Sequence, residues 1–269
     1  MNKAYTLKNL NNFLFKEVSI APLVVFRLVF GSLLLYSTYR TYEKGWIKEM
    51  YIDPYYHFSF FEWIKPLDEI GMYWIFALLA LTSIGIILGL FYRVSTVSFF
   101  LLFTYCELID KTYYLNHYYL VTILTFWMIW APANRWFSLD VKLFPKIKSS
   151  TCSLWYILIL KVQLSMVYFF AGLAKVNSDW LFEAQPMATW LPGLYEIPII
   201  GKIVHHKELA FLFSWMGCVY DLTIWILLWV KRTRGFAYIA VIVFHVLTAI
   251  LFPRIGMFPC IMMTSTLVF

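Results

Sequence analysis

Residues 71–91 decide the class of fold and read GMYWIFALLALTSIGIILGLF. This stretch contains no charged side chain. A helix needs roughly 20 consecutive apolar residues to cross the hydrocarbon core of a bilayer, and the stretch has that length. The sequence therefore predicts a transmembrane helix over residues 71–91.

Further apolar runs flank this stretch on both sides. They fall at about 20–41, 94–110, 117–131, 153–174, 211–230, 235–252 and 255–269. Inside a bilayer a helix satisfies all of its own backbone hydrogen bonds, so repeated apolar runs favour helices over an open sheet. We predict an all-α, polytopic transmembrane helical bundle with about eight membrane segments, some of them short, in a single domain over residues 1–269.

The composition excludes several other classes of protein. Hydrophobic residues make up 62% of the chain and charged residues only 14%, against about 25% in soluble domains. The formal net charge is +7, but Lys and Arg are scattered between apolar runs and form no basic stripe, which argues against nucleic acid as a partner. The four cysteines lack metal-ligand spacing, and no metal is expected. The lipid bilayer is the expected partner.

Two long loops, 42–70 and 175–210, are rich in aromatic residues and proline. Aromatic side chains favour the membrane interface, so we expect these loops to lie there and to cover a site. With the N-terminus in the cytoplasm, the cluster formed by Lys231, Arg232 and Arg234 lies inside, as the positive-inside rule favours. Both long loops and the short turn at 110–116 then face outward.

Ionisable residues inside membrane helices are costly and point to function or to pairing. We expect Arg27 to pair with a carboxylate, either Glu107 or Asp221. His245 stands in an apolar run, where it is either a hydrogen-bonded packing residue or a ligand contact. The sequence leaves both interpretations of His245 open.

The segment 108–120, LIDKTYYLNHYYL, places several polar groups in one tight turn between two apolar runs. Asp110 can pair with Lys111 or cap the next helix, which would make this a structural turn. The same turn brings Lys111, Asn116 and His117 to one depth, as a binding site requires. These two interpretations have equal weight.

Lys175 ends the apolar run 153–174. A lysine in this place either reaches the lipid headgroups or faces a dry cavity. In a dry cavity burial disfavours the charged form, and the neutral amine acts as a base near neutral pH. Gly172, three residues earlier, allows a neighbouring helix or a ligand to approach closely.

Several of these polar residues share one position in the predicted topology. They fall at helix ends on the outer side, beneath the aromatic loops, and His245 lies deeper. A polar cluster in an apolar pocket suits a ring with a polar head and an apolar tail, such as a quinone or a lipid. The helix-end residues are Asp110, Lys111, Asn116, His117, Lys175 and Arg254.

Three stretches resemble the membrane domain of the vitamin K-dependent γ-glutamyl carboxylase family, known as the HTTM domain. They are the DKT…NH motif within 108–120, the sequence AGLAKVNSDW at 171–180 and the sequence FHVLTAILFPRIGMF at 244–258. The segment 26–66 is also similar, so the resemblance covers nearly the whole chain. The motifs are specific together, in this order, rather than singly.

The resemblance implies a lyase that carboxylates glutamate and epoxidises vitamin K hydroquinone, with O2 and CO2 as co-substrates and no metal. The family's base lysine corresponds to Lys175, and His117 corresponds to the histidine that holds or polarises the hydroquinone. His245 and Phe258 match residues near the quinone site. In the same motifs, Asn116, Lys111 and Trp180 are expected to bind the quinone, for which a menaquinol-type ring is an alternative.

Two departures from the family pattern bear on this expectation. Animal members carry a second lysine where this chain has Ala174, and the family has a large non-membrane domain after the helices. We expect the natural protein to be a bacterial homologue that continues beyond Phe269 in an inner membrane, with its site toward the periplasm. A glutamate-containing peptide or protein is the expected partner, and carboxylating it is expected to need the additional domain.

Two rival hypotheses belong to other classes of function. The first is a non-catalytic quinone- or lipid-binding membrane module, in which Lys175 is protonated. The second is a transporter of a small solute, although no inverted repeat of the kind found in many transporters is evident.

Overall fold

The computed structural model describes residues 3–195, 201 and 204–269, so parts of the predicted 175–210 loop lie outside the described residues. The described chain is mainly helical and contains very little strand. Its two strands, β1 (Glu17–Ser19) and β2 (Thr151–Ser153), pair antiparallel with Val18 opposite Cys152. The predicted all-α class is confirmed.

Six of the described helices are long and apolar enough to cross a membrane. They are α2 (Ala21–Glu43), α3 (Glu69–Leu88), α4 (Tyr92–Ile109), α7 (Trp155–Ala174), α10 (Lys207–Trp229) and α11 (Arg234–Leu251). The other two predicted runs form the shorter helices α5 (Asn116–Trp130) and α12 (Phe258–Ser265). Each of the eight apolar runs thus contains a helix, and the chain is an integral, multi-pass membrane protein.

Shorter elements connect these helices, and the two predicted long loops are partly helical. The 42–70 segment contains η1 (Lys48–Ile52), and the 175–210 segment contains α8 (Ser178–Phe182), α9 (Met187–Trp190) and η4 (Leu191–Leu194). The remaining elements are α1 (Lys3–Leu14), η2 (Lys111–Tyr113), α6 (Leu139–Leu143), η3 (Pro145–Ile147), η6 (Pro253–Ile255) and η7 (Thr266–Val268).

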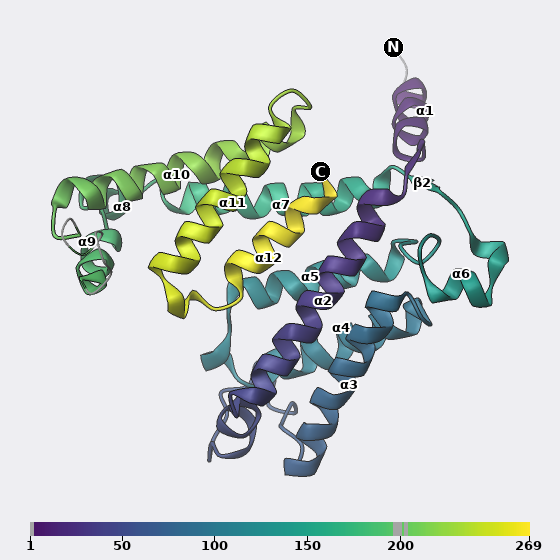
Figure 1. Ribbon diagram of the computed structural model, residues 1–269, viewed down its shortest axis with the longest axis horizontal. Coiled ribbons are helices and arrows are strands. Elements are labelled where there is room, and N and C mark those ends of the chain that lie inside the picture. Colours follow the sequence, from purple (N-terminus) through teal and green to yellow (C-terminus); the bar gives the residue numbers. More distant parts are fainter. Residues whose placement is uncertain (1–2, 196–200, 202–203) are drawn as a thin grey trace. The chain divides into compact units, whose positions relative to one another are not determined.

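The chain divides into two compact units, and each is described by itself. Unit 1 comprises Met1–Leu160 and Cys260–Val268, and unit 2 comprises Lys161–Pro259 and Phe269. In unit 1, α2, α3 and α4 pack in sequence order, as Figure 1 shows. Gly31 on α2 permits this packing, because a Cβ there would lie 2.9 Å from the side chain of Ile87 on α3.

Arg27 joins α2 to the end of α3 and to the segment after α5. Its side chain is fully buried, and its guanidinium donates to the carbonyls of Ile86 at 3.2 Å, Ile87 at 2.9 Å and Phe137 at 2.5 Å. The last carbonyls of a helix have no partner within it, so Arg27 supplies the missing donors for α3. Gly89 follows with φ +58°, and a Cβ there would overlap the guanidinium.

The expectation that Arg27 pairs with Glu107 or Asp221 is therefore wrong. Arg27 lies near the start of α2, whereas Glu107 lies near the end of α4. The helices α2 and α4 run in the same direction, since α3 returns between them, so these side chains lie at opposite ends of the packed helices. Asp221 has another partner, which is described below.

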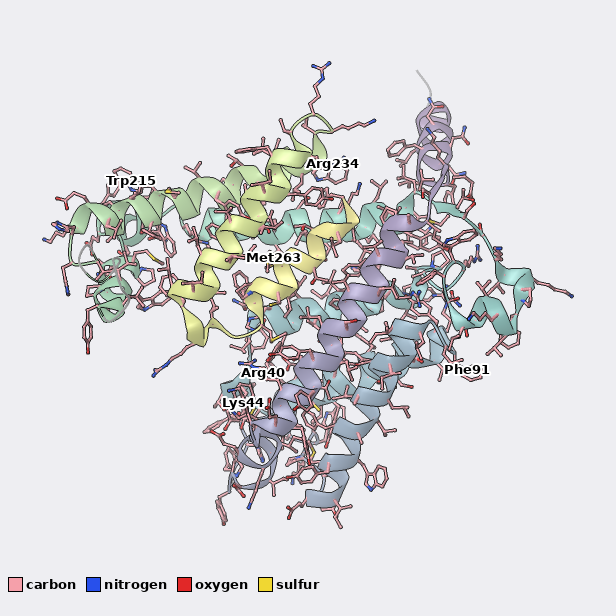
Figure 2. The ribbon with its side chains drawn as sticks, viewed as in Figure 1. Arg40, Lys44, Phe91, Trp215, Arg234 and Met263 are labelled. Atoms are coloured by element: carbon pink, nitrogen blue, oxygen red, sulfur yellow. The ribbon has the colours of Figure 1, made fainter. Side chains whose placement is uncertain are left out.

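Asp140 fixes the same end of unit 1. Its carboxylate accepts hydrogen bonds from the backbone N–H groups of Phe91 at 2.7 Å and Tyr92 at 3.0 Å, and from the Asn134 side chain at 2.8 Å. The acceptor is well placed, because the first N–H groups of a helix lack partners and carry partial positive charge. Figure 2 labels Phe91 in this turn between α3 and α4.

In unit 2, the helices α10 and α11 are neighbours joined by a short turn (Figure 1). Arg234 begins α11, and its Nε donates to the Leu228 carbonyl near the end of α10 at 3.0 Å (Figure 2). The start of α10 packs on α8 and α9 around a small apolar core. This core contains Ala184, Met187, Leu191, Val204 and Ala210.

Candidate functional site

The residues expected to form the site fall into two groups. Lys111, Asn116 and His117 belong to unit 1, and the other four, Lys175, Trp180, His245 and Phe258, belong to unit 2. The structure gathers each group within its own unit. The meeting of the two groups at one ligand stays a prediction.

The turn after α4 is capped by Asp110, but through Thr112 rather than Lys111. Asp110 Oδ1 accepts from the Thr112 backbone N–H at 2.9 Å and from the Thr112 hydroxyl at 2.8 Å. Asp110 Oδ2 lies 3.3 Å from His57 Nδ1. His57 and Asp110 are 53 residues apart, and no pattern in the sequence connects them, so this contact was not predicted.

The 42–70 segment is tied to this turn by backbone hydrogen bonds as well. Phe60 N–H donates to the Leu108 carbonyl at 3.1 Å, and Lys111 N–H donates to the Phe58 carbonyl at 2.9 Å. The aromatic segment thus covers the turn, as the sequence predicts. These bonds use a carbonyl at the end of α4 and an N–H at the start of η2, which are backbone groups that helix ends leave unpaired.

Asp110 also gives the turn a defined pH dependence. Burial alone raises the pKa of this carboxyl, but the hydrogen bonds from Thr112 and His57 outweigh burial and hold the pKa below its usual value. A lowered pKa in the folded state means that the carboxylate stabilises the fold above its ordinary pKa of about 3.9. This stabilisation is lost as the pH falls through the lower, folded-state pKa.

Replacing Asp110 with asparagine is expected to cost about 1–2 kcal/mol of stability at pH 7, because charge-assisted hydrogen bonds are lost. The deficit relative to the parent is expected to shrink as the pH is lowered toward 3. Thermal unfolding in detergent between pH 3 and 7 measures this difference in stability between Asp110→Asn and the parent. Asp53→Asn is the matched control, since the Asp53 side chain is 59% exposed. An equal deficit in both variants, or one that grows in acid, would contradict the role given to Asp110.

A cavity of about 490 Å³ opens beside this turn, within unit 1. Its volume falls within the usual range for sites that bind small molecules. Its surface is mostly apolar, with a few polar groups. The lining side chains are Phe60, Thr104, Glu107, Leu108, Lys111, Tyr114, Tyr119 and Thr122.

Three of the polar lining residues carry buried atoms that have no hydrogen-bond partner in the described part of the chain. They are Thr104 Oγ1, Glu107 Oε2 and Thr122 Oγ1. Buried polar atoms are normally paired, so several at one cavity indicate a place for a polar ligand group or for water. Lys111 lies at the rim, with its Nζ 5.4 Å from the centroid of the Phe60 ring.

Asn116 and His117 begin α5 and stand, along the chain, between the lining residues Tyr114 and Tyr119. The His117 ring packs edge-on against Tyr118 with the centroids 4.7 Å apart. Of the two interpretations, the structural cap is confirmed, and binding of a ligand by Lys111, Asn116 and His117 stays a prediction. Asp110 caps the turn, and the residues after the cap border a cavity.

Lys175 lies directly after α7, and its ammonium forms an ion pair. Its Nζ donates to Asp221 Oδ2 at 2.6 Å and to the Ala171 carbonyl at 3.1 Å. The side chains of Lys175 and Asp221 are only 20% and 9% exposed. Lys175 therefore does not extend to the headgroups. The sequence contained both residues but no signal that would join positions 46 apart.

Gly172 explains why α7 and α10 come close enough for this pair. A Cβ at Gly172 would lie 2.8 Å from the Leu222 side chain and 2.9 Å from the Leu222 backbone nitrogen. Leu222 immediately follows Asp221 on α10. The close helix approach that the sequence predicts at Gly172 thus brings Asp221 within reach of Lys175.

Trp180 forms one wall around the lysine. The Lys175 Nζ lies 5.1 Å from the Trp180 ring centroid, a cation–π geometry. The indole N–H donates to the Ser214 carbonyl on α10 at 2.7 Å, which fixes the orientation of the ring. Asn177 caps α8 by accepting from the Trp180 backbone N–H at 2.9 Å, so the motif after Lys175 is a helix start.

His245 lies in α11 with its ring fully buried. Its Nε2 is 3.2 Å from the Tyr168 hydroxyl of α7, and the Phe258 ring lies edge-on with its centroid 5.5 Å away. The other ring nitrogen, Nδ1, has no hydrogen-bond partner among the described residues. His245 is thus a hydrogen-bonded packing residue whose Nδ1 has no partner among the described residues.

The tyrosine Tyr220 links His245 to the ion pair. Its ring packs edge-on against Tyr168 at 5.9 Å and stands 6.2 Å from the His245 ring, and it directly precedes Asp221. The unit 2 group therefore extends from the His245 ring, through two tyrosines, to Asp221 and Lys175. Neither tyrosine is predicted by the sequence, because an aromatic residue in a membrane helix carries no distinguishing pattern.

These observations define an all-α integral membrane protein with polar groups gathered in two units. The HTTM domain model matches residues 15–269, and the chain belongs to this family. The HTTM domain is the domain of the vitamin K-dependent γ-glutamyl carboxylase family, so the resemblance inferred from the three motifs is confirmed. No solved structure matches the chain.

Proposed function

We propose that this chain is the membrane domain of a vitamin K-dependent carboxylase that also epoxidises the quinone. The reaction oxidises vitamin K hydroquinone with O2 to the epoxide and water, and the coupled step replaces a γ-hydrogen of glutamate with CO2. The observation that carries the proposal is the position of Lys175. The family's base lysine corresponds to a residue that is held here in an apolar niche by Asp221 and Trp180.

The residues of unit 1 fit a hydroquinone ring. Its two hydroxyl groups are donors, and Glu107 Oε2 is a buried acceptor without a partner among the described residues. The hydroxyl groups of Thr104 and Thr122 offer further acceptors at the same cavity. Tyr114 and Tyr119 supply aromatic surface. When bound, the hydroquinone would supply the reducing equivalents for the oxygen chemistry.

Asp221 provides a way for Lys175 to act as a base, because it can accept the proton of the ammonium group. An ion pair favours the charged ammonium, which cannot accept a proton. Transfer of the proton across the 2.6 Å contact to Asp221 gives a neutral amine beside a neutral carboxyl group. In an apolar niche the neutral pair avoids the cost of desolvating two charges. In this proposal Asp221 holds the proton that Lys175 must release before it works.

The remaining residues position the ring and exclude water. His117 and Asn116 begin α5, between the cavity-lining residues Tyr114 and Tyr119 along the chain, and in this proposal the imidazole polarises a ring oxygen. His245 Nδ1 is a second buried polar atom that can meet a ligand oxygen. Within unit 1 Lys111 lines the cavity, and within unit 2 Trp180 packs on Lys175 and the Phe258 ring packs on His245. An enclosed, largely apolar site protects strongly basic species from water.

The proposed orientation puts the cavity on the outer, periplasmic side of a bacterial inner membrane. The turn at 110–115 contains one basic residue, Lys111, at the end of α4. The segment 131–154 connects α5 to α7 at the opposite end of α4 and α5, and it contains four, Arg135, Lys142, Lys146 and Lys148. Basic residues in short loops favour the cytoplasm. This supports an inward-facing 131–154 segment.

The experiment is an epoxidation assay on the purified protein in lipid vesicles. Vitamin K hydroquinone and O2 are supplied, the epoxide is measured, and menaquinol is tested alongside. Incorporation of labelled CO2 into a glutamate-containing peptide measures the coupled step. Epoxide formation that requires O2 supports the proposal. A protein that binds the hydroquinone but forms no epoxide refutes it.

A non-catalytic quinone-binding module is the second candidate function. The Lys175–Asp221 ion pair favours it, because the pair stabilises an ammonium group that serves packing alone. This candidate predicts quinone binding without turnover. It also predicts that uncharged substitutions of both pair members leave quinone binding intact.

A further inference from the structure

A second cavity, of about 440 Å³, lies in unit 1 at the end opposite the 110–116 turn. We infer that it binds an anionic phospholipid. The headgroup phosphate would lie at Lys142 and Lys148, and an acyl chain would run along Leu28, Ile87 and Leu88, all of which line the cavity.

The segment that supplies the lysines is strongly basic. Residues 131–154 contain four basic side chains and one acidic side chain, Asp140, for a net charge of +3. Asp140 is buried, and both of its carboxylate oxygens accept hydrogen bonds from the α4 start and from Asn134. The acid is thus already engaged, and the positive charge of the segment remains available to an anion.

The two lysines at the cavity are exposed. Neither forms an ion pair with an acidic residue within the described ranges. The Lys148 ammonium lies 5.1 Å from the Trp136 ring centroid, which holds it beside the cavity. Two ammonium groups at one apolar cavity match the phosphate and the acyl chain of an anionic lipid.

The position of the cavity matches the depth of lipid headgroups. It lies where α3 ends, at Leu88, and its other walls come from the start of α2 and from the segment after α5. Helix ends of a membrane bundle lie at the interface between hydrocarbon and water. Trp136 and Phe137 stand there with 40% and 73% of their surface exposed, as interfacial aromatic residues do.

The wall of the cavity is held in place by the buried Arg27. Its guanidinium binds the carbonyls of Ile87 and Phe137, which both line the cavity. Phe137 has φ +48°, an unfavourable backbone conformation for a residue with a side chain. The charged hydrogen bond to its carbonyl stabilises that conformation. A wall prepared in this way binds a ligand with little further loss of conformational entropy.

This inference does not rest on the proposed reaction. The cavity contains none of the residues proposed to bind hydroquinone or to act on it. Loss of lipid binding and loss of epoxidation are therefore measured separately, and either can fail alone.

The experiment compares two double variants with equal charge. Lys142→Gln/Lys148→Gln removes the proposed ligands, and Lys146→Gln/Lys231→Gln removes two exposed lysines that do not line the cavity. Purified protein is titrated with phosphatidylglycerol or phosphatidylcholine, and bound lipid is counted by native mass spectrometry. The parent is expected to prefer phosphatidylglycerol, and the Lys142/Lys148 variant to bind it about 30-fold more weakly.

A third variant keeps both lysines and fills the cavity. Leu88 is 42% exposed, so Leu88→Trp is compatible with folding, and we expect it to lose phosphatidylglycerol as well. Inorganic phosphate is expected not to compete, since it lacks the acyl chain. Equal weakening in both double variants, equal binding of the two lipids by the parent, or full binding by Leu88→Trp would each overturn the inference.

Discussion

Replacing Lys175 with alanine is expected to abolish epoxide formation, with a loss of about 10²–10⁴-fold in rate. This is the usual contribution of a positioned general base. The structure places no second amine beside Asp221 among the described residues, since Asp221 pairs with Lys175 alone. Epoxide yield from vitamin K hydroquinone, measured on matched amounts of folded protein, checks this result.

The single variant Lys175→Ala must be tested beside a second variant, because it leaves the Asp221 carboxylate buried without its counter-ion. An unpaired buried charge is strongly destabilising. The double variant Lys175→Ala/Asp221→Asn removes this charge and is expected to fold while remaining inactive. Lys231→Ala, at an exposed lysine in the turn before α11, is the matched control and is expected to keep full activity.

Chemical rescue separates a base from a packing residue. If Lys175 supplies a neutral amine, small primary amines added to the double variant are expected to restore part of the epoxidation rate. If the lysine only supports the fold, added amines have no effect on a folded, inactive variant. Full activity in Lys175→Ala would remove Lys175 from the mechanism.

Replacing Arg27 with methionine is expected to cost at least about 3 kcal/mol of stability. Its guanidinium serves three backbone carbonyls, and hydrogen bonds to a charged group contribute about 1.5–3 kcal/mol each. Methionine preserves much of the volume and donates nothing, so the carbonyls of Ile86, Ile87 and Phe137 lose their donor. Denaturation of the purified protein in detergent measures the change.

Arg93→Met is the matched control at the same end of unit 1. Arg93 is exposed and donates one hydrogen bond, to the Trp130 carbonyl at 3.0 Å, so its loss is expected to cost less than about 1 kcal/mol. Arg27→Lys is expected to fall between the two, because an ammonium keeps the charge but lacks the planar fork. Equal losses of stability in Arg27→Met and Arg93→Met would show that the buried Arg27 guanidinium does not stabilise this end of unit 1.

Local sequence predicted the features of the site that depend on neighbours along the chain. The cap at Asp110 is such a feature, because its partner Thr112 lies two residues later. Residues so near in sequence lie near in space, whatever the rest of the chain does. The contact of His57 with Asp110 was not predictable, since it depends on how the 42–70 segment folds back on the turn.

The pairing of charges shows the same limit. The sequence predicts that Arg27 and Asp221 need partners in a membrane, but the partner expected for Arg27, Glu107 or Asp221, was wrong. A buried arginine is satisfied equally well by carboxylates or by carbonyls at a helix end, and composition does not distinguish these solutions. The packing of α2 on α3 places the Arg27 guanidinium next to backbone carbonyls. The packing of α7 on α10 places Lys175 next to Asp221.

The sequence by itself determined the environment of the protein, its helical class and its family, because apolar length and motif order are properties of the chain alone. The tertiary structure decided which polar groups meet: the Lys175–Asp221 pair, the Arg27 contacts and the two cavities of unit 1. The physical reason is that apolar burial in a membrane is non-directional and tolerates many arrangements. Hydrogen bonds and ion pairs require fixed distances, which only the packed helices provide.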